Sequence, residues 1–121
     1  FDCIADGESL SFMRPSDIFS LFGNAMDNAI EASSKIPDEG RRIISLSVRV
    51  QLGMVVIHLE NNYEGELIFS DGLPRTTKDD ENYHGFGVRS IRDTAAAYGG
   101  TASFTSRDGW FEARLLFVQP D

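Results

Sequence analysis

Two asparagines stand four residues apart in the segment Asn24-Ala25-Met26-Asp27-Asn28, inside a stretch with strong helical character. Residues four apart share one face of a helix, so Asn24 and Asn28 present two carboxamides side by side. A carboxamide oxygen is a neutral ligand for a hard cation, and the NH₂ group donates hydrogen bonds to phosphate. With Asp27 and Glu31 nearby, this pair predicts a platform for Mg²⁺ and phosphate; the alternative is a solvated polar stripe.

Two other polar segments follow apolar or irregular stretches. Asn61 comes at the end of a strand-like apolar run, where an amide offers both a donor and an acceptor to the edge of a base. His84-Gly85-Phe86-Gly87 precedes a helix that we expect from about Val88, and glycines let the backbone of a helix N-terminus approach a phosphate closely. The alternatives are a strand-end turn at Asn61 and a tight loop-to-helix turn at the glycines.

The polar segment 63–84 separates these two motifs. A loop of about 20 residues within a compact domain is typical of a functional lid or of a disordered segment. Thr77 and Lys78 would close a hydroxyl and an ammonium over phosphates, with Arg89 as a second candidate cation. The charge run 78–81 is equally consistent with a solvated surface.

Composition limits the possible functions. A chain of 121 residues is one domain, 1–121, and a net charge of −8 argues against nucleic acid as a partner. A single cysteine, Cys3, excludes an internal disulfide, and with two histidines it argues against a transition-metal site. His58 lies in an apolar run and is interpreted as a packed histidine. The apolar runs are too short to span a membrane, and the start at Phe1 indicates a fragment of a longer, cytosolic chain.

Two helices are expected to position these groups. The first opens at Pro15, with Ser16 as its cap and Asp17 at the positive end of the dipole, and it stops near Lys35. Its apolar residues recur at helical spacing and should face the core: Ile18, Leu21, Phe22, Ala25, Ala29 and Ile30. The second helix, 88–98, should end in a left-handed cap at Gly99-Gly100.

Strand-like patterns surround the helices. Segments 1–5 and 9–13 are expected to form a hairpin or a bent edge strand, 42–51 a half-buried strand, and 54–59 a central strand. Segments 101–106 and 110–118 predict a closing hairpin around Asp108-Gly109. This order predicts an α+β fold: a two-layer sandwich whose mixed, mostly antiparallel sheet carries the helices on one face.

In this order and spacing, the segments resemble the Bergerat-fold ATP-binding domain shared by gyrase, histidine kinases and MutL. The segment 24–29 is similar to the family's N box, which implies that Asn28 ligates Mg²⁺ and that Asn24 supports the metal and phosphates. Residues 59–62 fall where the first glycine box begins; the family has Asp-x-Gly-x-Gly there, and only Asn61 and Gly65 can be mapped. Segment 85–88 is similar to the second box, Gly-x-Gly-Leu, with Val88 in place of leucine.

In its departures from the family pattern, the sequence is similar to sensor histidine kinases of the quorum-sensing, accessory-gene-regulator type. That resemblance implies ATP and Mg²⁺ as cofactors, and as partners an upstream dimerisation domain with the phosphoacceptor histidine and a response regulator. It implies a cytoplasmic part of a membrane-anchored kinase, itself without membrane contact and monomeric in isolation. The implied nucleotide-binding residues are Asn24, Asn28, Asn61, Gly65, Thr77, Lys78, His84, Gly85, Phe86, Gly87 and Val88, with Asn24, Asn28 and Lys78 nearest the reaction.

One chemical inference separates kinase from ATPase. In hydrolysing members of the family, a glutamate four residues before the Mg²⁺ asparagine activates water, and this chain has Asn24 there. An amide is a poor general base, so the site should hold ATP without hydrolysing it efficiently, as suits a kinase. The alternatives are an anti-sigma-factor serine kinase of the same fold and a degenerate interaction module that no longer binds ATP.

Overall fold

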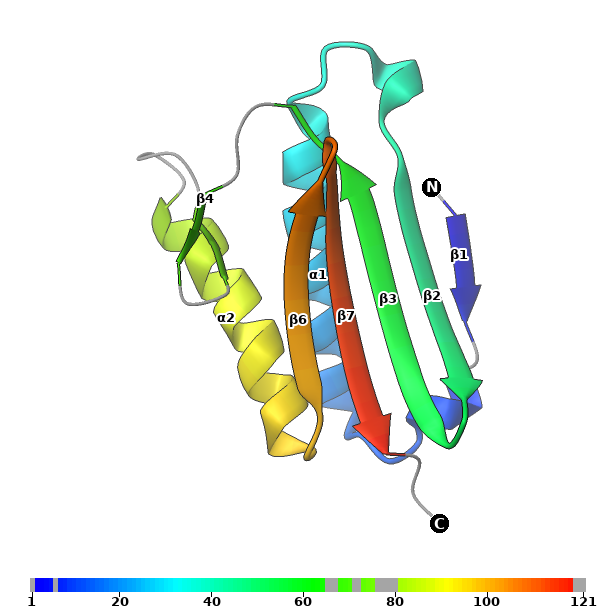
Figure 1. Cartoon of the computed structure of the whole chain (residues 1–121). Helices are drawn as coiled ribbons and strands as arrows, with labels where there is room; N and C mark the ends of the chain where they lie inside the picture. The colour runs from blue at the N-terminus through cyan, green and yellow to red at the C-terminus, as the bar shows by residue number, and fades with distance from the viewer. Residues whose placement is uncertain (1, 6, 65–67, 71–72, 76–80, 119–121) are drawn as a thin grey trace.

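The computed structural model has two layers, a five-stranded sheet and two helices that cover one of its faces (Figure 1). It describes residues 2–5, 7–64, 68–70, 73–75 and 81–118. The sheet has the strand order β1-β2-β3-β7-β6; β1 runs parallel to β2, and every other pair is antiparallel. The predicted α+β sandwich with a mixed, mostly antiparallel sheet is therefore confirmed.

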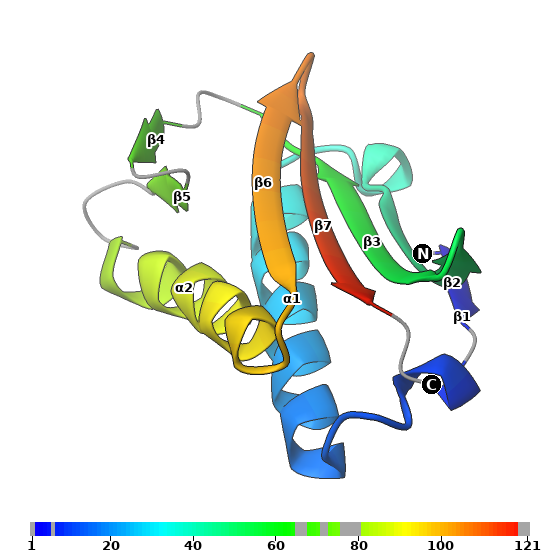
Figure 2. The same ribbon diagram turned by 60° about the horizontal axis from the view of Figure 1, so that its bottom comes forward.

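In the chain, the first helix comes between one strand and a pair of strands, and the second helix comes between two pairs of strands. The sheet strands are β1 (Asp2–Ala5), β2 (Ile44–Gln51), β3 (Met54–Asn62), β6 (Thr101–Arg107) and β7 (Trp110–Val118). The helices are α1 (Pro15–Ser34) and α2 (Glu81–Ala97), with short 3₁₀ turns η1 (Gly7–Leu10) and η2 (Glu39–Arg41). A separate hairpin, β4 (Ile68–Ser70) and β5 (Leu73–Arg75), lies beside α2 (Figures 1 and 2).

The central strand β3 explains why the helices pack where they do. Alternate residues of β3 point toward the helices, and Val55, Ile57 and Leu59 are almost completely buried. Leu21 of α1 and Ile91 of α2 join the same cluster. Fully burying one such side chain stabilises the fold by about 1.5–3 kcal/mol, so this apolar row fixes which face of the sheet is covered.

Helix α1 begins at Pro15, as predicted, but Ser16 is not its cap. Arg14 occupies the N-cap position, and its side chain makes no capping hydrogen bond. The Tyr98 hydroxyl, from just beyond α2, instead accepts a hydrogen bond from the Arg14 N–H at 3.0 Å and donates one to Asp17. A partner 84 residues away leaves no signal in the local sequence, which explains why Ser16 was wrongly predicted as the cap.

Replacing Tyr98 with phenylalanine should lower the free energy of unfolding by about 1–2 kcal/mol, because it removes a hydroxyl that makes two hydrogen bonds. The ring would keep its edge-on contact with Phe12, whose centroid is 5.9 Å away. Urea unfolding measures the effect. Tyr63→Phe is the matched control, since the Tyr63 hydroxyl has no hydrogen bond to another described residue; equal losses in both variants would contradict the assignment.

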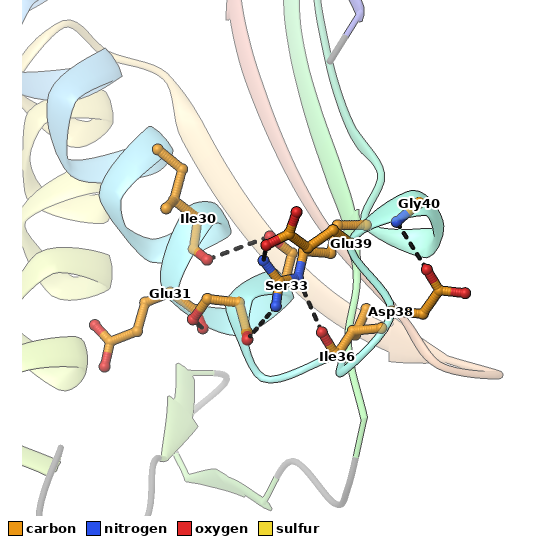
Figure 3. A network of polar contacts seen from close by, with 9 residues as sticks. Ile30, Glu31, Ser33, Ile36, Asp38, Glu39 and Gly40 are labelled. Carbon is orange, nitrogen blue, oxygen red and sulfur yellow. Dashed lines mark hydrogen bonds and ion pairs between the residues drawn. The ribbon is translucent and has the colours of Figure 1, made fainter.

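The predicted end of α1 near Lys35 is confirmed, and a short polar network follows it (Figure 3). Ser33, which is buried, donates its hydroxyl to the Ile30 carbonyl at 3.2 Å, and its own carbonyl accepts from the Ile36 N–H at 3.0 Å. Asp38 then caps η2 through the Gly40 N–H at 2.9 Å. Ile30 itself is 52% exposed, so its predicted place in the core is wrong.

Three other boundaries differ from expectation. Residues 9–13 are not a strand: η1 and a turn occupy this region, and their apolar residues are buried, with Leu10 and Met13 in the core. β1 pairs with β2 rather than with a hairpin partner, as an edge strand. The segment 63–84 is not a plain loop, because it contains β4 and β5 and the first turn of α2.

The C-terminal third follows the sequence closely. Gly99 is left-handed with φ 73°, and the Gly100 N–H donates to the Ala95 carbonyl at 2.9 Å, which confirms the predicted cap. Asp108 and Gly109, at φ 53° and 82°, form the predicted tight turn of the β6–β7 hairpin.

Candidate functional site

The two asparagines of the predicted platform lie along the seam between α1 and α2. Asn24 and Asn28 are both half-buried and outside the apolar core. Asn24 donates its Nδ2 to the Ser90 Oγ of α2 at 3.3 Å, and Tyr98 meets Asp17 further along the same seam. The two helices therefore run in opposite directions along the seam, and Figures 1 and 2 show their axes crossing obliquely, with the start of α2 away from the end of α1.

Asn28 lies one turn beyond Asn24 along α1, and residues 86 and 87 lie one turn before Ser90 along α2. The bond from Asn24 to Ser90 therefore sets both predicted motifs toward the same end of the seam, although they are far apart in the sequence.

A groove opens where the seam reaches the far end of α2. Its volume is about 310 Å³, at the lower end of the range for small-molecule sites. It is lined by Asp17, Arg89, Ser90, Asp93, Thr94, Ala97 and Tyr98. Ser90, the partner of Asn24, forms part of the wall, and Arg89 contributes a guanidinium.

Asn61 is the most unusual residue of the site. It follows Leu59 on the helix-facing side of β3 and is 0% exposed, the polar end of an otherwise apolar row. Its Nδ2 donates to the Asn62 carbonyl at 3.1 Å, whereas its Oδ1 is buried and has no hydrogen-bond partner in the described parts of the chain. A buried acceptor without a donor costs about 1–3 kcal/mol, so this oxygen is suited to accept from a donor that the described residues do not supply.

Its neighbour Asn62 has a different role. The Asn62 Oδ1 accepts from the Ile43 N–H at 2.9 Å, and its Nδ2 donates to the Arg41 carbonyl, so the side chain ties the entry of β2 to the end of β3. The alternative considered for this asparagine pair, a structural connector, therefore applies to Asn62 and does not account for Asn61.

The glycine motif lies in a different element from the one predicted. Helix α2 begins at Glu81, seven residues before Val88, so His84, Gly85, Phe86 and Gly87 are helical and do not precede the helix. The free N–H groups in the first turn of α2 therefore belong to residues 81–83, not to Gly85 and Gly87. An acidic residue in the first turn of a helix favours this earlier start.

The remaining predicted residues divide into two groups. Val88 is 0% exposed and packs in the core, so its described role is to hold α2 on the sheet. Gly65, Thr77 and Lys78 lie outside the described residues.

Sequence reasoning missed the β4–β5 hairpin and the residues Ser90 and Tyr98. The hairpin did have a signal, because Asp71-Gly72 is a typical two-residue turn sequence between strand-like segments. Ser90 and Tyr98 had none, since their partners Asn24 and Arg14 are more than 60 residues away in the chain.

Comparison with known families decides the family. The sequence profile described as the GHKL domain matches residues 13–118, nearly the whole chain. The chain belongs to the GHKL family. Comparison of this GHKL domain with curated proteins finds no significant match in sequence.

Solved structures of histidine kinases share the fold of this GHKL domain. The catalytic domain of histidine kinase ThkA matches with a TM-score of 0.68 at 19% identity, covering 100% of this chain and 80% of that one. The histidine kinase domain of an Erythrobacter litoralis blue-light activated kinase matches at 0.65 and 17%, covering 98% and 50%. Histidine kinase AdeS of Acinetobacter baumannii matches at 0.61 and 18%, covering 88% and 47%.

The present chain spans about half the length of the last two proteins. At sequence identities of 17–19%, these structural matches establish a common fold alone. Within the described part of this GHKL domain, no helix combines the length and the apolar character needed to cross a membrane.

Proposed function

We propose that this GHKL domain is the ATP-binding catalytic domain of a sensor histidine kinase of the accessory-gene-regulator type. It would transfer the γ-phosphoryl group of ATP to a histidine on a separate dimerisation domain, from which a response regulator is then phosphorylated. The observation that carries the proposal is the buried Oδ1 of Asn61, which has no partner among the described residues. It lies at the end of β3 toward which the C-terminal half of α1 also runs (Figure 1).

The hydrogen bonding of Asn61 favours adenine. One N–H of its Nδ2 donates to the Asn62 carbonyl, so the side chain offers a ligand the buried Oδ1 acceptor beside its second N–H. The exocyclic amino group of adenine is a donor, whereas guanine has a carbonyl oxygen at the corresponding position. A buried acceptor that faces another acceptor is left unsatisfied, so the site should prefer ATP to GTP.

The donor set of the seam fits a Mg²⁺-bound polyphosphate. The Asn28 carboxamide offers the oxygen that would hold the ion, and Asn24, tied to Ser90, would support it from behind. When bound, Mg²⁺ supplies neutralisation of phosphate charge, which is the main requirement of phosphoryl transfer. Arg89 is a candidate for contacting the phosphates.

We assign the other predicted residues to the same ligand. By the family resemblance these are Gly65, Thr77, Lys78, His84, Gly85, Phe86, Gly87 and Val88. Asn24 has no carboxylate to accept a proton from water, so bound ATP should be hydrolysed slowly and kept for the acceptor histidine. His58 is no candidate acceptor within this site, because it lies on the outer face of the sheet, opposite Arg114.

The direct test is thermal unfolding with and without Mg²⁺-ATP. A ligand at 100 times its dissociation constant stabilises its protein by about 2.7 kcal/mol, and GTP at the same concentration should give a clearly smaller effect. No stabilisation by either nucleotide would favour a degenerate interaction module. Phosphotransfer to a serine of a partner protein, with none to a dimerisation-domain histidine, would favour the anti-sigma-factor kinase instead.

The variant Asn61→Leu should weaken ATP binding about tenfold or more, because a side chain of similar size without an acceptor loses the bond to the adenine amino group, worth roughly 1.4 kcal/mol. Calorimetric titration measures the change. Asn61→Asp keeps an acceptor oxygen and should retain ATP binding. Unchanged affinity in Asn61→Leu would show that the base lies elsewhere.

A further inference from the structure

The outer face of the sheet, away from the helices, carries a compact group of metal-ligand side chains. His58 and Glu60 are two apart on β3 and so share one face, and the β3–β7 register sets Glu112 opposite Glu60. The ligand atoms of these three residues all lie within 4.8 Å of one another, and all three side chains are half-buried. We call His58, Glu60 and Glu112 the outer-face triad.

The apolar run around His58 predicts a packed histidine with satisfied hydrogen bonds, and the structure does not show this. Its Nε2 lies 3.2 Å from the Glu112 Oε1, but the contact lacks hydrogen-bond geometry, and Nε2 is buried with no hydrogen-bond partner among the described residues. In a tetrahedral zinc site with bonds of about 2.0–2.1 Å, neighbouring ligand atoms are roughly 3.3 Å apart. The His58 Nε2 and the Glu112 Oε1 therefore already lie at the separation of two ligand atoms in such a site.

The charges of Glu60 and Glu112 also favour a bound cation. Glu60 and Glu112 are directly opposite on neighbouring strands, an arrangement that normally destabilises a sheet. Arg114 offsets part of this charge, since its Nη2 lies 3.3 Å from the Glu112 Oε1, but Glu60 has no ion pair within the described structure. A divalent cation between the two carboxylates would neutralise both.

We propose that the outer-face triad binds a divalent transition-metal ion, with Zn²⁺ as the best fit. One imidazole nitrogen and two carboxylates form a mixed nitrogen and oxygen set, which suits Zn²⁺, Ni²⁺ or Cu²⁺ better than Mg²⁺ or Ca²⁺. Three protein ligands leave one tetrahedral position open for water or for a side chain of another molecule. The sequence argued against such a site because it has one cysteine and two histidines, whereas the fold brings Glu112, 54 positions after His58, beside the pair on β3.

Titration of the chelator-treated domain with ZnCl₂, in the absence of nucleotide, tests the proposal. We expect saturable binding of one equivalent. His58→Gln, Glu60→Gln and Glu112→Gln should each weaken it at least about tenfold, the scale seen even when groups behind metal ligands are removed. Arg114→Gln should tighten it, because the guanidinium beside Glu112 competes with the metal for that carboxylate.

The chain supplies matched controls. His84→Gln removes the only other histidine and Cys3→Ser the only thiol, and both should leave zinc binding unchanged. The proposal is overturned if His58→Gln binds zinc like the parent, if either control abolishes binding, or if MgCl₂ competes equally well. X-ray absorption of the zinc-loaded domain should show one imidazole with oxygen ligands.

The result is separable from nucleotide binding. The triad lies on the face of the sheet opposite α1, so His58→Gln should retain the parent affinity for Mg²⁺-ATP in the same calorimeter. Absence of zinc binding would leave the roles of Asn28 and Asn61 intact, and absence of ATP binding would leave the triad intact.

Discussion

Replacing Asn28 with alanine is expected to abolish Mg²⁺-ATP binding while leaving the fold intact. Asn28 is half-buried on the α1–α2 seam and lies outside the apolar core, so its removal leaves the packing of Leu21 and Ala29 unchanged. The loss of a metal-ligating oxygen should weaken binding at least 100-fold, or about 2.7 kcal/mol. Isothermal titration calorimetry with Mg²⁺-ATP measures the affinity, and circular dichroism establishes that the variant is folded.

Two variants on the same helix make the test specific. Asn28→Asp keeps a hard oxygen ligand and should retain measurable binding. Asp27→Ala changes an exposed neighbour on a different face of α1 and should bind like the parent. If Asn28→Ala binds Mg²⁺-ATP with unchanged affinity, the metal site is not on this helix, and the kinase proposal fails with it.

The parts of this fold that the sequence predicted are those governed by local rules. Helical spacing placed Leu21 and Ala29 in the core, and Asp108-Gly109 marked a tight turn. Period-2 alternation identified β2, and a near-continuous apolar run identified β3. Each of these signals lies within one element. The layer arrangement followed from the order of the elements, because amphipathic helices must cover the apolar face of a sheet.

The errors arose where distant residues decide the outcome. At the start of α1 the N-cap is Arg14, whose N–H is bonded to Tyr98, and not Ser16. Ile30 is 52% exposed despite its helical spacing. The start of α2 was placed too late because glycines were interpreted as loop residues. In the structure, Val88 and Ile91 anchor α2 on the sheet, and packing of this kind outweighs the weak helix propensity of glycine.

The same distinction between local signals and distant contacts applies to the candidate site. Spacing alone paired Asn24 with Asn28. The bond from Asn24 to Ser90, and the buried oxygen of Asn61 for which no described residue is a donor, could be found only from the fold. The Asn61-Asn62 pair shows why. Two identical side chains adjacent in sequence point to opposite faces of β3, so one is buried at the site and the other ties a connection.

Replacing Gly100 with alanine should cause the largest loss of stability among the substitutions considered. A Cβ atom at Gly100 would lie 2.5 Å from the Leu116 carbonyl oxygen and 2.5 Å from Cδ1 of Phe117. That carbonyl belongs to the backbone of β7 beside its pairing with Thr101, and the Phe117 ring is buried in the core. Neither group can move without disturbing the sheet or the core.

We expect Gly100→Ala to lower the free energy of unfolding by about 3 kcal/mol, at the upper end of the effect of overpacking. A typical domain has only about 5–15 kcal/mol, so this is a large fraction of the total. Urea unfolding should show a lower midpoint with an unchanged slope, because the variant exposes the same surface when it unfolds.

Gly23→Ala is the matched control for this substitution. A Cβ at Gly23, in the middle of α1, would meet nothing within 4 Å, so the same chemical change should stabilise the domain by about 0.5–1 kcal/mol. Opposite signs for the two variants would show that the close approach of β7, and not glycine flexibility, sets the requirement at position 100. If the free energy of unfolding of Gly100→Ala is within about 0.5 kcal/mol of the parent value, the close approach of Gly100 to β7 is contradicted.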